Sequence, residues 1–228
     1  MAAPGQPYFR DRVTGLRAAA AARSAAGLAS PCMCEPVLTV IRHGETEWSR
    51  SGQHTGRTDL DLTEAGQAQA KRLGQALAGI RFDVVLCSPR LRAQRTAELA
   101  GLVPFTVYDD LAEWDYGELE GLTTAEIQAQ YPDWSIWNGP WPGGETATQV
   151  AARADRVIDR AVEGGWARVA VVGHGHMSRV LAARWVGAQV AVGQWLDLDT
   201  ASLSELGWSR NLRVLRQWNV TAPDVERE

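Results

Sequence analysis

Residues 37–44 read VLTVIRHG, a run of five apolar or β-branched residues followed directly by arginine, histidine and glycine. A run of this length and composition is typical of a buried strand. A similar arrangement returns at residues 168–176, which read RVAVVGHGH. In open α/β sheets, ligands bind beyond the carboxyl ends of the strands. The two histidine-glycine turns therefore indicate a functional site at one edge of a sheet.

Apolar strands and helices alternate along the rest of the chain. This alternation predicts an α/β fold, a three-layer α/β/α sandwich with a largely parallel central sheet. Thr63 is suited to cap the first helix. We expect strands at 37–41, 83–87, 105–108 and 168–172, helices at 62–78, 89–100, 123–130, 146–162 and up to 185, and a closing hairpin at 202–208 and 212–218.

Residues 1–36 differ from the rest of the chain because they are rich in alanine with scattered arginine. Arg17 and Arg23 interrupt the apolar run that a secretory signal would need. An arginine-rich targeting peptide is one alternative. We predict instead that residues 1–36 are a disordered extension, or follow from a start codon placed too far upstream. Residues 37–228 are then the functional domain.

Composition excludes several classes of partner. The formal net charge of -4 gives no reason to expect nucleic acid. Three cysteines make neither a disulfide framework nor a zinc site. No stretch has the length and apolarity of a membrane span. We therefore expect a cytoplasmic protein without nucleic-acid or membrane partners, and the sequence leaves a homodimer open.

All four histidines fall in two places. His43 and His54 follow the first predicted strand, and His174 and His176 follow the fourth. A lone histidine is often a structural residue, but two groups at two strand ends favour a functional interpretation. Because strand ends meet at one edge of the sheet, both groups are expected in one site.

Arginines gather at the same strand ends. Arg42 precedes His43, and the segment SPRLRAQRTAEL after the second strand contains Arg92 between two further arginines. Arginine offers planar, permanently charged donors that match phosphate oxygens in pairs. Glycines such as Gly44 and Gly175 let the backbone approach an anion closely. Without an aspartate-rich metal set, this cluster indicates phosphoryl chemistry in which protein charges replace a cation.

Phosphoryl transfer to a histidine also needs a proton donor for the leaving alkoxide. The segment LAEWDYGELEG, which follows the third predicted strand, offers Glu113, Glu118 and Glu120. Glu113 is the natural candidate, but chemistry alone does not choose among the three. The alternative is that all three are solvated loop acids.

Four segments together resemble the histidine phosphatase superfamily, the phosphoglycerate mutase-like proteins: RHGET, SPRLRAQRTA, LAEWDYGELEG and VVGHGHMSR, in the family's order and spacing. The resemblance covers about residues 37–208. It implies that His43 is a nucleophile that becomes phosphorylated and that Glu113 is the acid and base. It also implies a reaction without metal or other cofactor. The implied phosphate pocket consists of Arg42, Arg92 and His174.

Within the family, the chain is similar to broad-specificity acid and sugar-phosphate phosphatases, which share its SGQ-x-TG and GHGH segments. Thr55 and Gly56 match a Thr-Gly pair that approaches the phosphate pocket. Ser49 stands where true mutases have asparagine. The resemblance thus implies further substrate contacts, which we assign to Ser49, Thr55, Gly56 and Gly175.

The resemblance implies a phosphatase that acts on small phosphorylated metabolites, such as sugar phosphates. The alternatives are a cofactor-dependent phosphoglycerate mutase and a non-catalytic module that binds a phosphorylated ligand. A mutase must hold a second anionic group, for which the family uses basic residues after the acid/base glutamate. Residues 96–152 contain no lysine or arginine. That absence favours the phosphatase.

The sequence leaves two interpretations open for His176 and two for the tryptophan-rich segment. His176 either contacts substrate or packs on protein at the start of a helix. The tryptophans of DWSIWNGPWPGGET either form a flap on the substrate side or anchor their own loop.

Overall fold

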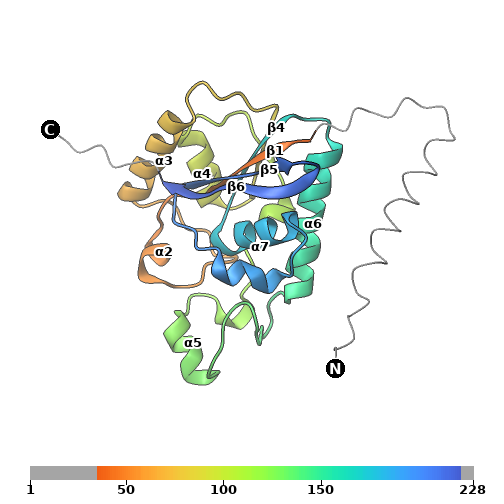
Figure 1. Ribbon diagram of the computed structural model, residues 1–228. Helices are drawn as coiled ribbons and strands as arrows, with labels where there is room; N and C mark the ends of the chain where they lie inside the picture. Colours follow the sequence, from red (N-terminus) through yellow and green to blue (C-terminus); the bar gives the residue numbers. More distant parts are fainter. Residues whose placement is uncertain (1–34, 222–228) are drawn as a thin grey trace, which may run out of the picture. The chain divides into compact units, whose positions relative to one another are not determined.

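The computed structural model describes residues 35–221, so nearly all of the predicted N-terminal extension lies outside the described residues. Within 35–221, the strands form one six-stranded sheet in the order β3-β2-β4-β1-β5-β6 (Figure 1). The strands are β1 (Val37–Arg42), β2 (Val84–Cys87), β3 (Thr106–Val107), β4 (Arg168–Gly173), β5 (Ser202–Ser209) and β6 (Leu212–Thr221).

The sheet is mixed. The four strands β3, β2, β4 and β1 pair in parallel. β5 runs antiparallel to β1, and β6 runs antiparallel to β5, so the predicted closing hairpin forms one edge. The expectation of a largely parallel sheet is therefore confirmed for the strands whose carboxyl ends carry the predicted site.

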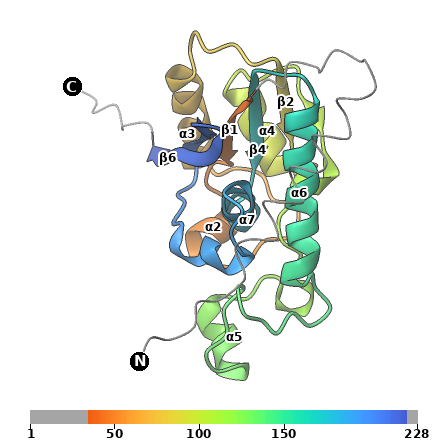
Figure 2. The same ribbon diagram turned by 45° about the vertical axis from the view of Figure 1, so that its right-hand side comes forward.

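Helices cover both faces of this sheet, which confirms the predicted three-layer sandwich. α3 and α4 pack on one face, and α6 and α7 pack on the other. Figure 2 views α7 nearly end-on beside α6. The helices are α2 (Glu47–Ser51), α3 (Glu64–Ala76), α4 (Leu91–Leu99), α5 (Thr124–Gln130), α6 (Ala147–Glu163) and α7 (Gly175–Trp185), with 3-10 turns η3 (Asp109–Leu111), η4 (Gly117–Leu119) and η5 (Val190–Trp195).

The core follows from the alternation of side chains along each strand. In β1, Leu38 and Val40 pack with the α6 and α7 layer, whereas Ile41 packs with the α3 and α4 layer. All three side chains are buried. Full burial of a side chain of this size stabilises the fold by roughly 1.5–3 kcal/mol relative to exposure.

Helix α2 was not expected from the sequence, which predicts only a polar loop between the first strand and the helix at 62–78. Its five residues are too few for an apolar period to be recognised. Local capping forms it instead: Thr46 Oγ1 accepts from the amide of Ser49, and Ser49 Oγ accepts from the amide of Thr46. The predicted strand at 105–108 is also shorter, since only Thr106 and Val107 pair with β2.

The register of the sheet brings the two histidine turns together. Arg42 of β1 lies opposite Gly173 of β4, and the amide of His43 donates to the carbonyl of Gly173 at 3.0 Å. The next residue after each strand is a histidine, His43 or His174. Their ring centroids are 5.2 Å apart.

Candidate active site

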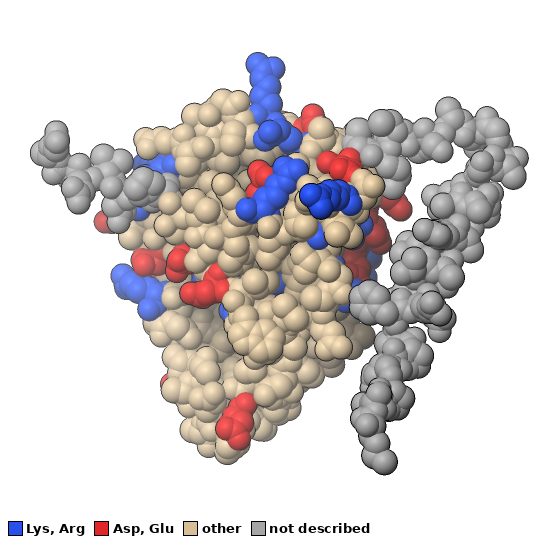
Figure 3. Space-filling model, viewed as in Figure 1, with Lys and Arg blue, Asp and Glu red and all other residues tan. Residues whose placement is uncertain are grey.

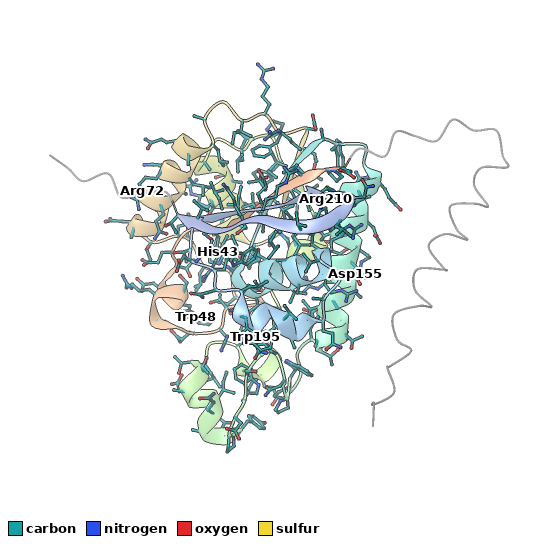
Figure 4. All side chains as sticks on the ribbon, in the orientation of Figure 1. His43, Trp48, Arg72, Asp155, Trp195 and Arg210 are labelled. Carbon is teal, nitrogen blue, oxygen red and sulfur yellow. The ribbon has the colours of Figure 1, made fainter. Side chains whose placement is uncertain are left out.

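A cavity of about 220 Å³ opens beyond the ends of β1 and β4. Of the residues that the sequence predicts for the site, six line this cavity: Arg42, His43, Ser49, Thr55, Glu113 and Gly175. Three others do not line it: Gly56, Arg92 and His174. The cavity is also lined by Trp48, His54, Tyr116, His176, Arg179 and Asp197. Figure 4 shows His43 and Trp48 in this region, below the strands.

The imidazole of His43 is held in one orientation. Its side chain is buried, and Nδ1 lies 2.7 Å from the carbonyl oxygen of Gly44. A carbonyl oxygen only accepts hydrogen bonds, so we assign the ring proton to Nδ1. Nε2 then keeps its lone pair, which is the requirement for a nucleophile.

The surroundings of His43 keep its ring neutral. Burial is the largest cause, and the positive charges of Arg92 and Arg42 add to it, so the pKa of His43 is well below its ordinary value of 6.5. A neutral imidazole beside two guanidinium groups combines a free nitrogen lone pair with positive charge. Attack on an anionic phosphoryl group needs both.

Arg42 contributes the charge at the cavity wall. Its Nη1 donates to the carbonyl of Leu198, which fixes the end of the side chain. Its Nε is buried and has no hydrogen-bond partner among residues 35–221. A buried donor without a partner is costly, so it marks a place where an anionic ligand would be accepted.

Arg92 and His174 lie behind His43 rather than on the cavity wall. Both are fully buried. Arg92 Nε donates to His174 Nδ1 at 3.1 Å, so the proton of His174 is on Nε2, which lies 2.6 Å from Ser88 Oγ. Burial, with the charge of Arg92 next, places the pKa of His174 well below 6.5. The two residues thus lie beside the nucleophile and behind the cavity surface.

Glu113 is the one acid of its loop that reaches the cavity. Its Oε1 accepts from the amides of Trp114 and Met177, both at 2.8 Å, and its Oε2 accepts from the amide of His176 at 3.0 Å. His176 and Met177 belong to the first turn of α7. The carboxylate therefore caps a helix whose own N-cap residue, His174, makes no side-chain cap bond. Capping by a carboxylate suits the partial positive charge of a helix N-terminus and fixes the orientation of Glu113.

A partly buried ion pair supports the Glu113 loop from behind. Arg153 of α6 bonds Glu145 at 2.6 Å, and the same guanidinium donates to the carbonyls of Ala112 and Glu113. Glu145 accepts from the amide of Asp115 at 3.0 Å. The loop is thus bonded on both sides of Glu113.

Gly56 does not approach the cavity as predicted. Its amide donates to the carboxylate of Glu120. A Cβ at this position would lie 2.7 Å from the carbonyl oxygen of Trp114, so packing requires the glycine. Gly175 differs, because it lines the cavity and a Cβ there would lie 3.4 Å from the guanidinium of Arg42.

A family model of the histidine phosphatase superfamily (branch 1) matches residues 38–221. The chain belongs to the histidine phosphatase superfamily. An acid phosphatase of Mycobacterium tuberculosis is 44% identical over 187 residues, which are 81% of this chain and 92% of that relative. The sedoheptulose 1,7-bisphosphatase of Saccharomyces cerevisiae is 36% identical over 188 residues, 68% of this chain and 69% of the relative.

A solved structure of an open reading frame of Mycobacterium tuberculosis has the same fold, with a TM-score of 0.79 at 42% identity. The match covers 82% of this chain and 99% of that chain. Fold and relatives agree that this histidine phosphatase is a phosphoric monoester hydrolase.

The histidine phosphatase cavity has a polar aromatic wall that the sequence only partly indicated. His176 Nδ1 lies 2.6 Å from the hydroxyl of Tyr116, and the ring of His54 lies 4.8 Å from that of Tyr116. Burial lowers the pKa of His54 to about 4 and raises that of Tyr116 well above 10. Both predicted roles of the His176 side chain are therefore compatible with the structure, since it lines the cavity where substrate would bind and also packs on protein. Tyr116 could have been suspected from its place three residues after Glu113.

The tryptophan loop mainly anchors itself. Trp134 and Trp141 each donate their indole N–H to a carbonyl of the same loop, both at 2.8 Å. Trp137 packs edge-on against the ring of His176 at 5.4 Å, and the guanidinium of Arg179 lies over it at 4.8 Å. No tryptophan of this loop lines the cavity. The loop therefore shapes the substrate side only indirectly, because Trp137 packs against His176 and Arg179, which line the cavity.

Within residues 35–221, no three histidine, cysteine, aspartate or glutamate side chains are arranged to hold a metal ion. None of the helices that the structure describes is long and apolar enough to cross a membrane.

The lowered pKa values of the four histidines predict a loss of stability in mild acid. The pKa values of His43, His174 and His176 are well below 6.5 in the folded state, and that of His54 is about 4, whereas each titrates near 6.5 when unfolded. Below about pH 6.5 the unfolded chain binds protons that the folded chain excludes, so stability is fully present above this pH and declines as pH falls. At about one pH unit below 6.5, each of these histidines lowers the free energy of unfolding by about 1.4 kcal/mol.

Melting temperatures measured at about pH 7.5 and about pH 5.5 check this expectation. The melting temperature at about pH 5.5 should be the lower of the two. A His54→Gln variant, which removes one of the titrating groups, should show a smaller difference between the two. An unchanged or higher melting temperature at the lower pH would contradict the assignment of neutral histidines in the folded state.

Proposed function

We propose that this histidine phosphatase hydrolyses small phosphomonoesters, sugar phosphates among them, with His43 as nucleophile and Glu113 as acid and base. The observation that carries this proposal is the fixed, neutral ring of His43, whose Nδ1 bonds the Gly44 carbonyl and whose pKa is lowered by burial and by Arg92 and Arg42. No group other than a nucleophile or a ligand would benefit from a free Nε2 held beside buried guanidinium charge.

The first step forms a bond between His43 Nε2 and phosphorus while the bond from phosphorus to the ester oxygen breaks. Glu113, protonated at this stage, gives its proton to the leaving alkoxide. In the second step a water attacks phosphorus, the N–P bond breaks, and the Glu113 carboxylate takes the proton from that water. Inorganic phosphate leaves, and both residues return to their starting state. Arg42, with Arg92 and His174 behind it, stabilises the charge on the equatorial oxygens.

The cavity suits a small, hydroxylated leaving group. Its volume of about 220 Å³ is below the roughly 300–1,000 Å³ of sites for larger ligands. Tyr116, His54 and Asp197 offer neutral and acidic hydrogen-bonding groups to sugar hydroxyls. The yeast relative is named for a sugar bisphosphate, which is the substrate class that we expect for this chain.

A second arginine in the cavity favours bisphosphates among these substrates. Arg179 lines the same cavity as Arg42. Its Nε and Nη2 donate to the carbonyls of Gly193 and Gln194, which anchors the side chain and leaves further N–H groups for a second anion. We expect an Arg179→Met variant to lose more kcat/KM on a sugar bisphosphate than on the matching monophosphate.

The phosphatase is favoured over the mutase by the charge of the segment beyond the cavity. Residues 96–152 contain no lysine or arginine. On the face shown in Figure 3, the lower part of the domain, formed around α5, shows acidic side chains and no basic ones. Such a segment supplies no positive charge to hold a second anionic group while a substrate reorients, so a second anion in this cavity is held by Arg179 and not by this segment.

Released phosphate from a panel of sugar monophosphates and bisphosphates tests the proposed function. Hydrolysis of several members by the purified chain is the expected outcome. A parallel reaction with 3-phosphoglycerate and a trace of 2,3-bisphosphoglycerate tests the alternative. Isomerisation much faster than phosphate release would show that the enzyme is a mutase.

Metal removal gives a separate prediction. Because positive charge at the site comes from arginine, EDTA should leave hydrolysis of an aryl phosphate unchanged. Vanadate, which imitates the trigonal phosphoryl group, should inhibit. Activity that disappears with EDTA and returns with Mg²⁺ or Zn²⁺ would contradict a metal-independent mechanism.

A further inference from the structure

The guanidinium of the buried Arg92 donates hydrogen bonds to one side of the loop between α2 and α3. Arg92 Nη2 donates to the carbonyls of Thr55 and Gly56, at 2.9 and 3.3 Å, and Nη1 donates to the carbonyl of Thr58 at 2.9 Å. The same guanidinium reaches His174 through Nε. The loop carbonyls therefore determine where the charge of Arg92 lies relative to the two histidines.

The carboxylate of Glu120 accepts hydrogen bonds from the other side of this loop. Glu120 Oε1 accepts from the amides of Gly56 and Thr58, both at 2.9 Å, and Oε2 lies 3.0 Å from the amide of Gly56. The peptide unit between Thr55 and Gly56 thus has its carbonyl on Arg92 and its N–H on Glu120. Charge-assisted bonds of this kind are stronger than neutral ones, so the plane of this peptide is fixed on both sides.

Glu120 itself has no place at the active cavity. It lines a separate cavity of about 260 Å³, together with Arg57 and Glu118. The other acids of its loop behave differently, since Glu113 lines the active cavity and the Glu118 side chain is exposed. The alternative that all three acids of this loop are solvated therefore does not hold for Glu120, although this residue does not touch the space where substrate binds.

We propose that Glu120 is a positioning residue for the phosphoryl group. It fixes residues 55–58, and through them it holds Thr55 at the cavity wall and the guanidinium of Arg92 beside His43. This inference rests on the proposed function, because it assigns Glu120 to the half of the site that handles the transferred group.

The proposal predicts a distinctive kinetic signature. Every substrate carries the same phosphoryl group, so loss of Glu120 should reduce kcat/KM equally for an aryl phosphate and a sugar phosphate. The affinity for vanadate, which imitates the transition state, should fall by the same factor. Displacement of such a group by about 1 Å can cost on the order of 10²-fold in rate, so we expect a loss of roughly 10- to 100-fold.

The experiment compares Glu120→Ala and Glu120→Gln with the wild type. The Gln variant keeps one oxygen that can accept from both amides, so it should retain more activity than the Ala variant. Glu118→Ala is the matched control, because this exposed acid of the same loop makes no side-chain hydrogen bond to residues 55–58, and its activity should stay within about twofold of wild type. Rapid alkaline quench after labelling with ³²P substrate counts the active sites in each sample.

Gly56→Ala perturbs the same loop independently. A Cβ there would lie 2.7 Å from the Trp114 carbonyl oxygen and 2.8 Å from Glu120 Oε2. It should reproduce the weakened vanadate inhibition, which keeps the test valid where Glu120→Ala folds poorly.

Two results would overturn the positioning role. One is an unchanged inhibition constant for vanadate in Glu120→Ala and Gly56→Ala, with activity lost only in proportion to labelled sites, since that pattern reports misfolding. The other is an equal loss in Glu118→Ala. An inactive wild type, by contrast, would refute the proposed function and this inference together, so the two failures are distinguishable.

Discussion

Replacement of His43 by alanine is expected to lower kcat/KM on an aryl phosphate by roughly 10⁴-fold or more, the scale on which removal of a nucleophile disables a covalent mechanism. His174, whose ring lies closest to that of His43 in the sheet register, is not free to replace it. His174 Nδ1 accepts from Arg92 and its Nε2 bonds Ser88, so neither of its nitrogens is free. His176 is bonded to Tyr116.

Trapping the intermediate makes this test specific. Wild-type enzyme mixed with ³²P-labelled substrate should carry label that survives alkali and is lost in acid, as a phosphohistidine requires. His43→Ala should carry none while melting at a temperature close to that of the wild type. Label that persists in His43→Ala would assign the nucleophile to another side chain.

Replacement of Glu113 by glutamine should remove general acid catalysis, which contributes typically 10²–10⁴-fold. The loss should depend on the leaving group. An aryl phosphate releases a weakly basic phenolate that needs little protonation, so its hydrolysis should suffer least. A sugar phosphate releases a strongly basic alkoxide, so its hydrolysis should approach the full loss.

The same substitution has a structural cost that must be measured beside it. Glu113 accepts from three amides, two of them in the first turn of α7. A glutamine amide group would face one of these N–H groups with another donor, and loss of a helix cap costs about 0.5–2 kcal/mol. Glu118→Gln, on the same loop but exposed, controls for a general effect of charge. Equal losses on both substrates in Glu113→Gln would place the acid role elsewhere.

The strand ends and their histidines were predictable because the signal is local. The apolar runs at 37–41 and 168–172 each end in a histidine-glycine pair, and parallel strands bring such ends together. The structure has the two strands as neighbours with Arg42 opposite Gly173. The same rule predicts Arg42, His43 and Glu113 at the cavity, because each lies at or after the carboxyl end of a parallel strand.

Other parts of the site depended on contacts between distant segments. Helix α2 exists through two side-chain caps, which no apolar period reveals. Asp197 reaches the cavity from the connection before β5, far from every histidine in sequence. The burial of Arg92 behind His43 follows from the backbone carbonyls of residues 55–58, whose positions the chain's local pattern does not specify.

By itself, the sequence determined the α/β class, the pairing of histidine turns at one sheet edge and the phosphoryl chemistry, because each of these rests on residue type and period. The roles of three acids in one loop were decided only by tertiary structure. Glu113 meets the amides of α7, Glu120 meets the amides of residues 55–58, and Glu118 meets solvent. The physical reason is that a carboxylate is placed by the N–H groups it accepts from, and those groups come from segments about 60 residues away in the chain.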